Sequence, residues 1–245
     1  MGLSVVIPIY NEKDNIRPLA RLITEAVNSQ NITEWEALFV NDGSHDGSGE
    51  ILDDLAKGDA SFKHIRLDRN HGQTAALDAG FRQAVHPLIL TMDGDLQNDP
   101  RDLAQLLKAM TDETGCVCGV RVQRRDNWLR RISSKIANGV RNRLSGEQIT
   151  DTGCSLKLFR KACLERIKLF EGMHRFLPTL CKLEGYLVAE VPVGHHPRRF
   201  GTSKYGVWNR VFRSFRDLLA VRWMKSRQLR YKIVDQKRSS LDHVA

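Results

Sequence analysis

Two carboxylates one residue apart end an apolar run in the segment 88–100 (LILTMDGDLQNDP). Residues i and i+2 of a strand point to the same side, so Asp93 and Asp95 can both face one ligand. Two like charges at that spacing repel each other, and a bound divalent cation relieves the repulsion. Asp-Gly is also a common turn dipeptide, so this segment alone agrees equally well with two solvated aspartates. Asp99 and Pro100 then predict a helix start, with Asp as its cap.

The elements that must position this pair alternate along residues 1–120. Short apolar runs that end in polar residues predict buried strands, and the segments between them have helical spacing. The strands are predicted at residues 3–10, 35–42, 62–67, 88–92 and 116–120, and the helices at 14–27, 46–57, 73–85 and 103–110. Four strand–helix units in a row predict an α/β fold with a mostly parallel central sheet and helices on both faces. Pro8 predicts that the end of the first strand is not paired as in a central strand.

Polar side chains follow four of these strands. They are Tyr10, Asn11 and Glu12 after the first strand, Asn41 and Asp42 after the second, Asp93 and Asp95 after the fourth, and Arg121 after the fifth. Ligands of parallel α/β sheets bind at the carboxyl ends of the strands. The agreement among four strand ends therefore favours a cation or nucleotide site over scattered turn residues. The sequence has neither a GxGxxG nor a P-loop motif, which argues against a dinucleotide-binding dehydrogenase and a P-loop NTPase.

Charge is divided unevenly in this chain of 245 residues, whose net charge is +9. Residues 1–100 carry 8 Lys/Arg and 16 Asp/Glu, net −8, whereas residues 101–245 carry 30 and 13, net +17. An acidic half suited to cations is thus joined to a basic half suited to phosphates, an anionic membrane or nucleic acid. The 5 cysteines lack CxxC spacing and predict reduced, mostly buried thiols. Without a signal peptide or a long apolar run, we expect a cytoplasmic protein.

The basic half contains three further features. A predicted helix from Trp128 places Arg130, Ser134 and Asn138 on one face, which is either a phosphate site or a solvated basic face. Strands are predicted at 155–159 and 186–193, with a helix from Met173 between them. The loop 198–206 (RRFGTSKYG) combines glycines with donors for phosphate oxygens. Residues 207–224 have an apolar stripe opposite arginines, which suits a helix in a membrane interface and equally a helix packed on its own domain.

Six motifs in this order resemble the family 2 glycosyltransferases. They are VVIPIYNE (5–12), VNDGSHDGS (40–48), NHGQTAALDAGF (70–81), TMDGDLQNDP (91–100), DTGC (151–154) and RRFGTSKYG (198–206). More narrowly, they are similar to the polyprenyl-phosphate branch, whose members resemble dolichyl-phosphate mannose synthase. The resemblance implies a GT-A fold, a GDP- or UDP-linked sugar donor, a Mg2+ or Mn2+ cofactor, and inversion at the anomeric carbon.

The same resemblance assigns roles to matching positions. The nucleotide-sugar site would comprise Pro8, Tyr10, Glu12, Val40, Asp42, Asp93, Gly94, Arg198 and Lys204. Asp42 would lie at the base or ribose, Arg198 and Lys204 would close over the diphosphate, and Asp95 with Gln97 would hold the metal. The acceptor phosphate would meet Arg121, Arg130 and Ser134. Asp93, Asp95 and Arg121 would be the catalytic residues, and the role of Asp151 stays open.

The expected reaction transfers the sugar to a polyprenyl (undecaprenyl or dolichyl) phosphate. Two alternatives remain: transfer to a soluble sugar or protein hydroxyl, which needs a general base, and a non-catalytic nucleic-acid-binding module. Few aromatic residues are interleaved with the basic ones and no nucleic-acid motif is present, so nucleic acid is not expected as a partner.

We expect a GT-A catalytic domain at 1–206, with a nucleotide-binding half at 1–120 and an acceptor-binding half with the closing loop at 121–206. An amphipathic interfacial helix and a polar tail would follow at 207–245. Many bacterial members carry transmembrane helices after the SKY loop, and this sequence has none. It resembles the soluble members, which are peripheral on the inner face of the membrane through such a helix, here 207–224. A membrane-protein partner or a homo-oligomer is a further expectation.

Overall fold

The computed structural model describes residues 2–122, 149–197, 207–229 and 231. Its strands are β1 Gly2–Ile9, β2 Glu34–Asn41, β3 Phe62–Arg66, β4 Leu88–Thr91, β5 Thr114–Arg121, β6 Lys157–Arg160 and β7 Leu187–Val193. Its α-helices are α1 Lys13–Ser29, α2 Ser48–Gly58, α3 Gln73–Gln83, α4 Leu103–Ala109, α6 Lys161–Leu164, α7 Leu177–Leu183 and α8 Val207–Ser226, and its 3-10 helices are η1 Pro100–Asp102 and η2 Met173–Phe176. Every strand and helix predicted within the described ranges is present.

The strands form one sheet in the order β3-β2-β1-β4-β6-β5-β7. The pairs β1–β2, β1–β4, β2–β3 and β5–β7 are parallel, whereas β6 is antiparallel to both of its neighbours. The prediction of a mostly parallel sheet is confirmed. Because β6 reverses direction, β5 and β7 run the same way as β1, and their carboxyl ends lie at the same edge.

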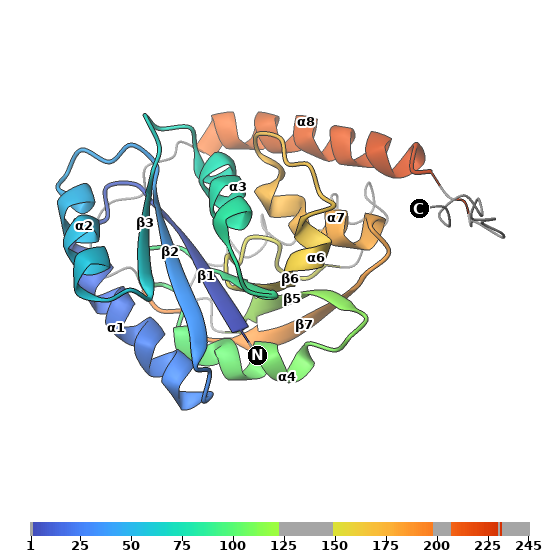
Figure 1. The fold of residues 1–245 in the computed structure, drawn as a ribbon. Helices are drawn as coiled ribbons and strands as arrows, with labels where there is room; N and C mark the ends of the chain where they lie inside the picture. The colour runs from blue at the N-terminus through green and yellow to red at the C-terminus, as the bar shows by residue number, and fades with distance from the viewer. Residues whose placement is uncertain (1, 123–148, 198–206, 230, 232–245) are drawn as a thin grey trace, which may run out of the picture.

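Helices cover both faces of this sheet, as Figure 1 shows. Alternate residues of β1 point to opposite faces. Leu3, Val5, Ile7 and Ile9 join the core under α1, α2 and α4, whereas Val6 joins the core under α3, α6 and α7. This second core contains four of the five cysteines, and all five are buried and unpaired, as predicted.

The expectation for Pro8 holds on one side of its strand only. The ladder between β1 and β4 ends at Val6, but the ladder between β1 and β2 continues through Pro8 to Ile9. Pro lacks an N–H donor, so it fits where one neighbour has already turned away. β4 turns away here because it ends at Thr91 and leads into the acidic loop.

α8 lies along the surface of the fold above α3 and α7 (Figure 1). Leu218 and Val221 are buried against Met173, Phe176 and Leu180, so the prediction of packing on its own domain is correct for this side. The opposite side leaves Leu219 46% and Trp223 64% exposed. No helix in the described ranges is long and apolar enough to cross a membrane.

Glu36 on β2 is a buried carboxylate whose ionisation contributes to the stability of the fold. Its carboxylate, with only 4% of the side chain exposed, pairs with Lys63 at 2.5 Å and accepts hydrogen bonds from Ser4 (2.6 Å) and the Val85 amide (2.8 Å). Burial alone would raise the pKa of Glu36, but these partners outweigh it and hold the pKa below its usual value. Glu36 therefore stabilises the fold above the usual glutamate pKa of about 4.3, and this contribution is lost as pH falls through the lower pKa of the folded state.

We expect Glu36→Gln to lower the free energy of unfolding by about 1–3 kcal/mol at neutral pH, since an amide replaces a buried, charge-paired acceptor. Urea unfolding at about pH 7 and about pH 3 measures the effect, and the difference from the wild type should shrink at the lower pH. A difference that stays constant with pH would contradict an ionised Glu36.

Candidate active site

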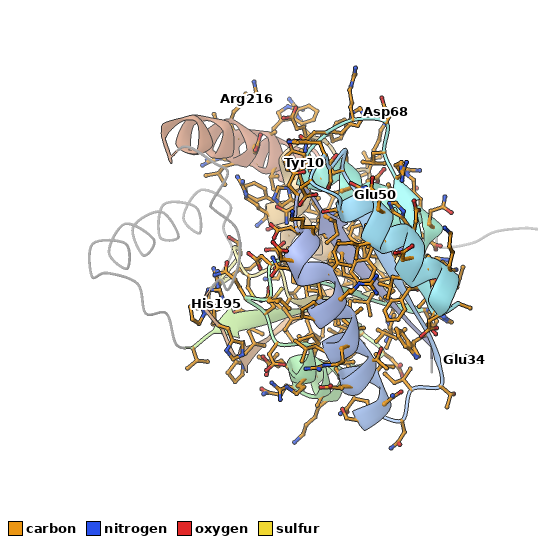
Figure 2. All side chains as sticks on the ribbon, turned by 90° about the vertical axis from the view of Figure 1, so that its left-hand side faces the viewer. Tyr10, Glu34, Glu50, Asp68, His195 and Arg216 are labelled. Atoms are coloured by element: carbon orange, nitrogen blue, oxygen red, sulfur yellow. The ribbon has the colours of Figure 1, made fainter. Side chains whose placement is uncertain are left out.

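The predicted site residues that the structure describes lie at the carboxyl edge of the sheet. In the parallel register, Ile9 pairs with Asn41 and Gly2 with Glu34. Tyr10 and Glu34 accordingly lie far apart in Figure 2, Tyr10 in the upper part of the molecule and Glu34 at its lower right. The loops after β1, β2, β4 and β5 therefore share one edge, as the sequence predicts.

The loops after β1 and β2 are joined by hydrogen bonds. The amides of Asn11, Glu12 and Lys13 donate to the side chains of Ser44 (2.9 Å), Ser48 (3.1 Å) and Asp46 (3.1 Å), respectively. Asn11 has φ 55°, a left-handed conformation that Asn tolerates better than most residues. The ring of Tyr10 meets His45 edge-on at 6.0 Å. These bonds fix Tyr10 and Glu12 beside the end of β2.

Asp42 is 3% exposed and binds a neighbouring loop. Its carboxylate accepts hydrogen bonds from the amides of His71 (2.7 Å) and Gly72 (2.9 Å) and from the Asn70 side chain (3.0 Å). A carboxylate accepts about four hydrogen bonds in all. These described partners leave about one acceptor position for a nucleoside, so the expected contact with a base or ribose stays a prediction.

The acidic loop after β4 is held on three sides. Gln73 at the start of α3 donates to Asp93 Oδ1 at 2.8 Å, and the Asp93 amide donates to Ser155 Oγ at 3.2 Å. Leu96 has φ 60° and is nevertheless buried in the core under α1. A Cβ on Gly94 would lie 2.5 Å from Ile9 Cδ1, so only glycine permits this close approach to β1. The loop therefore stores backbone strain, which its buried Leu96 holds in place.

Asp95 and Gln97 carry oxygen donors suited to a hard divalent cation. Asp95 is 6% exposed, and its Oδ1 accepts from the Gln97 amide at 3.2 Å. Gln97 Nε2 donates to the His196 carbonyl at 3.4 Å, which turns the amide oxygen the other way. In the described ranges, no group of three His, Cys, Asp or Glu side chains is arranged to hold a metal. The oxygen donors of this loop that fit the predicted cation are therefore the carboxylate of Asp95 and the amide oxygen of Gln97, beside the carboxylate of Asp93.

The surroundings of Asp93 shift its pKa. Burial and the neighbouring charge of Asp95 raise the pKa of Asp93, while Ser155, Lys157 and Arg121 oppose the rise. A cation bound at this loop would reverse the repulsion between the two carboxylates. The pair is thus arranged for a ligand that brings positive charge.

Arg121, the last residue of β5, is paired with Asp151 by two hydrogen bonds. Nε and Nη2 of Arg121 donate to Asp151 at 2.7 and 2.8 Å, and the side chains are 17% and 8% exposed. Burial would lower the pKa of Arg121, but Asp151 outweighs it and raises the pKa. Asp151, whose role the sequence leaves open, therefore holds the guanidinium in one orientation.

A small pocket opens beside Asp93. Apolar residues such as Pro8 line part of it, and its polar lining includes Gln73, Thr91, Asp93, Thr152, Ser155, Lys157, His174 and Arg175. Ser155 also donates to Asn98 at 2.7 Å, so the turn before β6 is tied to the acidic loop. The pocket is a cavity at the sheet edge with mixed hydroxyl, amide and charged groups.

The remaining predicted residues divide into two groups. Val40 is fully buried among the side chains under α3, so any contact with a nucleotide is restricted to its main chain. Arg130, Ser134, Arg198 and Lys204 lie outside the described residues. Gln73, Ser155 and Lys157 were not predicted from the sequence, although Gln73 lies within the motif of residues 70–81 and Ser155 directly follows that of residues 151–154.

Comparisons with known proteins agree with this arrangement. Residues 4–168 match the family described as Glycosyl transferase family 2. The chain is 38% identical to a dodecaprenyl-phosphate galacturonate synthase from Rhizobium johnstonii, over 95% of this chain and 68% of the relative. It is 35% identical to an undecaprenyl-phosphate 4-deoxy-4-formamido-L-arabinose transferase from Aeromonas hydrophila, over 85% of this chain and 64% of the relative. The chain thus spans about two thirds of the length of the curated relatives it matches.

Solved structures show the same fold. A glucosyl-3-phosphoglycerate synthase from Mycobacterium tuberculosis, in complex with Mn2+, uridine diphosphate and glucosyl-3-phosphoglycerate, superposes with a TM-score of 0.68 at 16% identity. The match covers 91% of this chain and 79% of that one. A mannosyltransferase from Pyrobaculum calidifontis, in complex with GDP-Man and Mn2+, gives 0.64 at 19% identity, over 91% and 63%. The predicted GT-A fold is confirmed.

Proposed function

Because the chain belongs to glycosyl transferase family 2, we propose that it transfers a sugar from a nucleotide-sugar to the phosphate of a polyprenyl lipid. Both curated relatives compared above are named for polyprenyl-phosphate acceptors, but for different sugars. The observation that carries the proposal is the pairing of opposite charges at one sheet edge. Asp93 and Asp95 face the donor side, and Arg121, oriented by Asp151, supplies a cation for an acceptor phosphate.

The acceptor chemistry explains why this site works without a general base. A phosphate monoester has a second pKa near 6, so it is largely ionised at neutral pH. It therefore needs orientation rather than deprotonation before it attacks the anomeric carbon. Arg121 would provide that orientation, with Arg130 and Ser134 as further predicted contacts. The result is an in-line displacement with inversion of the anomeric configuration.

The donor side holds the nucleotide-sugar. Asp95 and Gln97 would hold Mg2+ or Mn2+, which when bound supplies positive charge for the leaving nucleoside diphosphate. Tyr10, Glu12 and Asp42 would border the nucleoside, and Asp93, fixed by Gln73 and Ser155, would orient the sugar. Arg198 and Lys204 are proposed to close over the diphosphate.

Incubation with defined substrates tests this function. Purified protein receives Mn2+, undecaprenyl phosphate and a panel of GDP- and UDP-sugars, and lipid-linked sugar is scored as product. Undecaprenol, which differs only in lacking the phosphate, is the matched control and should give no product. Transfer to undecaprenol or to a soluble sugar would instead support a hydroxyl acceptor, and an RNA shift without any transfer would support the nucleic-acid alternative.

We further propose that α8 binds the cytoplasmic surface of the membrane. Leu219 and Trp223 are exposed on a helix that also carries exposed Arg216 and Arg222. Exposed apolar residues beside cations suit the interface of an anionic bilayer. Figure 2 shows Arg216 at the outer surface of this helix.

Replacing both Leu219 and Trp223 by Ser should reduce co-sedimentation with anionic liposomes by on the order of tenfold, since two apolar side chains no longer enter the interface. The control is Leu187→Ser, which removes a comparably exposed apolar residue (57%) from β7. Equal losses in both variants would argue against a specific role for α8.

A further inference from the structure

Lys157 is a buried cation without a carboxylate partner in the described part of the chain. The residue is 4% exposed on β6, and its ammonium group donates to the Cys154 carbonyl. By contrast, the neighbouring cation Arg121 is paired with Asp151 through two hydrogen bonds. A buried charge is costly unless an opposite charge accompanies it. A bound anion would supply the negative charge that the Cys154 carbonyl lacks.

The pocket that Lys157 lines is chemically suited to a sugar. Besides Lys157 it presents the basic side chains of His174 and Arg175 and a single acid, Asp93. Gln73, Thr152 and Ser155 add amide and hydroxyl groups of the kind that hydrogen-bond sugar hydroxyls. The lining therefore combines neutral hydrogen-bonding groups with basic side chains.

The pocket lies beside the proposed phosphate contacts of both substrates without including them. Asp95 and Gln97, which would hold the metal and with it the donor diphosphate, do not line the pocket. Arg121, the proposed contact of the acceptor phosphate, does not line it either, although Gly153 of the lining lies next to its guanidinium. Because Asp93 borders both regions, the anomeric carbon of a bound donor would lie next to this pocket. The anion that meets Lys157 would therefore belong to the sugar.

We propose that this pocket takes the sugar of the donor and that Lys157 binds a carboxylate on it, so that the donor is a nucleotide-linked uronic acid. The inference rests on the proposed function and adds the sugar class. A carboxylate and a buried ammonium form a charge-assisted hydrogen bond, stronger than one between neutral groups. With a neutral hexose, the only carboxylate near Lys157 in the pocket would be Asp93, which interacts with it electrostatically but forms no ion pair with it. The lack of a directly bound countercharge would disfavour the wrong donor.

Two donors that differ only at C6 test the inference. UDP-galacturonic acid has a carboxylate where UDP-galactose has a hydroxymethyl group, and isothermal titration with Mn2+ measures the Kd of each. Wild-type protein should bind the acid at least about tenfold more tightly. Lys157→Met should abolish this preference and leave the affinity for UDP unchanged, whereas Lys157→Arg should keep the preference. Lys161→Met removes a cation four residues away that pairs with Glu165 instead, and it should behave as the wild type.

Each outcome bears on one of the two proposals. Equal affinity of the wild type for the two donors, or a preference that survives in Lys157→Met, overturns the uronic-acid inference and leaves the proposed function standing. If UDP itself does not bind, the same comparison uses GDP-mannuronic acid and GDP-mannose. Failure of both nucleotides to bind with Mn2+ or Mg2+ overturns the proposed function. Thermal unfolding verifies that Lys157→Met is folded, and the wild-type comparison remains decisive if it is not.

Discussion

Replacing Asp95 by Asn is expected to reduce sugar transfer by about a thousandfold while the fold survives. Asn removes the only carboxylate from the two residues proposed to hold the metal, Asp95 and Gln97. The negative charge that develops on the leaving diphosphate would then be stabilised less well. The fold should persist because Asn keeps the Oδ1 that accepts the Gln97 amide. Initial rates with undecaprenyl phosphate and the accepted donor measure the effect, and a Mn2+ titration measures metal affinity separately.

The matched control is Asp54→Asn. Asp54 is 65% exposed and forms only a surface ion pair with Arg17, so this variant removes the same charge without touching the site. Its turnover and metal affinity should equal those of the wild type. If Asp95→Asn keeps its turnover and its affinity for Mn2+, then Asp95 is not a metal ligand and the assignment of the acidic loop is wrong.

The arrangement of the fold could be predicted from the sequence because its local signals agree with one another. The strands of the first half are mostly short apolar runs that end in polar residues, and each helix between strands has an apolar face that the sheet buries. The direction of β6 could not be predicted, because Lys157–Arg160 is too short for its hydrophobic pattern to report which neighbour it pairs with. The insertion of β6 between β4 and β5, antiparallel to both, is decided by tertiary packing.

The site was predictable in its location but not in its internal contacts. The ends of four strands place Tyr10, Asp42, Asp93 and Arg121 at one edge, as a parallel sheet requires. The sequence does not reveal that Asp42 binds the loop of residues 70–72, because that contact joins segments about thirty residues apart. Lys157 was missed for a related reason. A lysine in a short strand is ordinarily solvent-exposed, and only the packing of the sheet shows it buried.

Asp151 gains a role from the structure that the sequence left open. Its carboxylate matches the planar guanidinium of Arg121 with two near-parallel hydrogen bonds. Gly153, in the same turn, approaches closely: a Cβ there would lie 3.1 Å from Arg121 Nη2. The DTGC turn therefore acts as a support for Arg121. Asp151 would therefore be a positioning residue, acting on the proposed acceptor only through Arg121.

Replacing Asp151 by Asn should raise the KM for the polyprenyl phosphate and lower kcat, together reducing kcat/KM by about 10- to 100-fold, because a misplaced orienting group costs on that order. The KM for the nucleotide-sugar should change little, since the donor side does not depend on this ion pair. Asn is the appropriate replacement, because Asp151→Ala would leave Arg121 buried and unpaired at a cost of about 3–5 kcal/mol. Steady-state kinetics with each substrate varied in turn gives both constants.

A double-mutant cycle separates positioning from simple structural support. If Asp151 acts only by orienting Arg121, then Asp151→Asn should have little further effect in an Arg121→Lys background, because Lys cannot form the paired hydrogen bonds. Additive losses in kcat/KM would show that Asp151 contributes independently of Arg121. An unchanged acceptor KM in Asp151→Asn, with normal thermal unfolding, would show that Arg121 does not meet the acceptor phosphate. We expect neither additive losses nor an unchanged acceptor KM, because the two hydrogen bonds between Arg121 and Asp151 make the orientation of Arg121 depend on Asp151. The two residues should therefore affect acceptor binding as one unit.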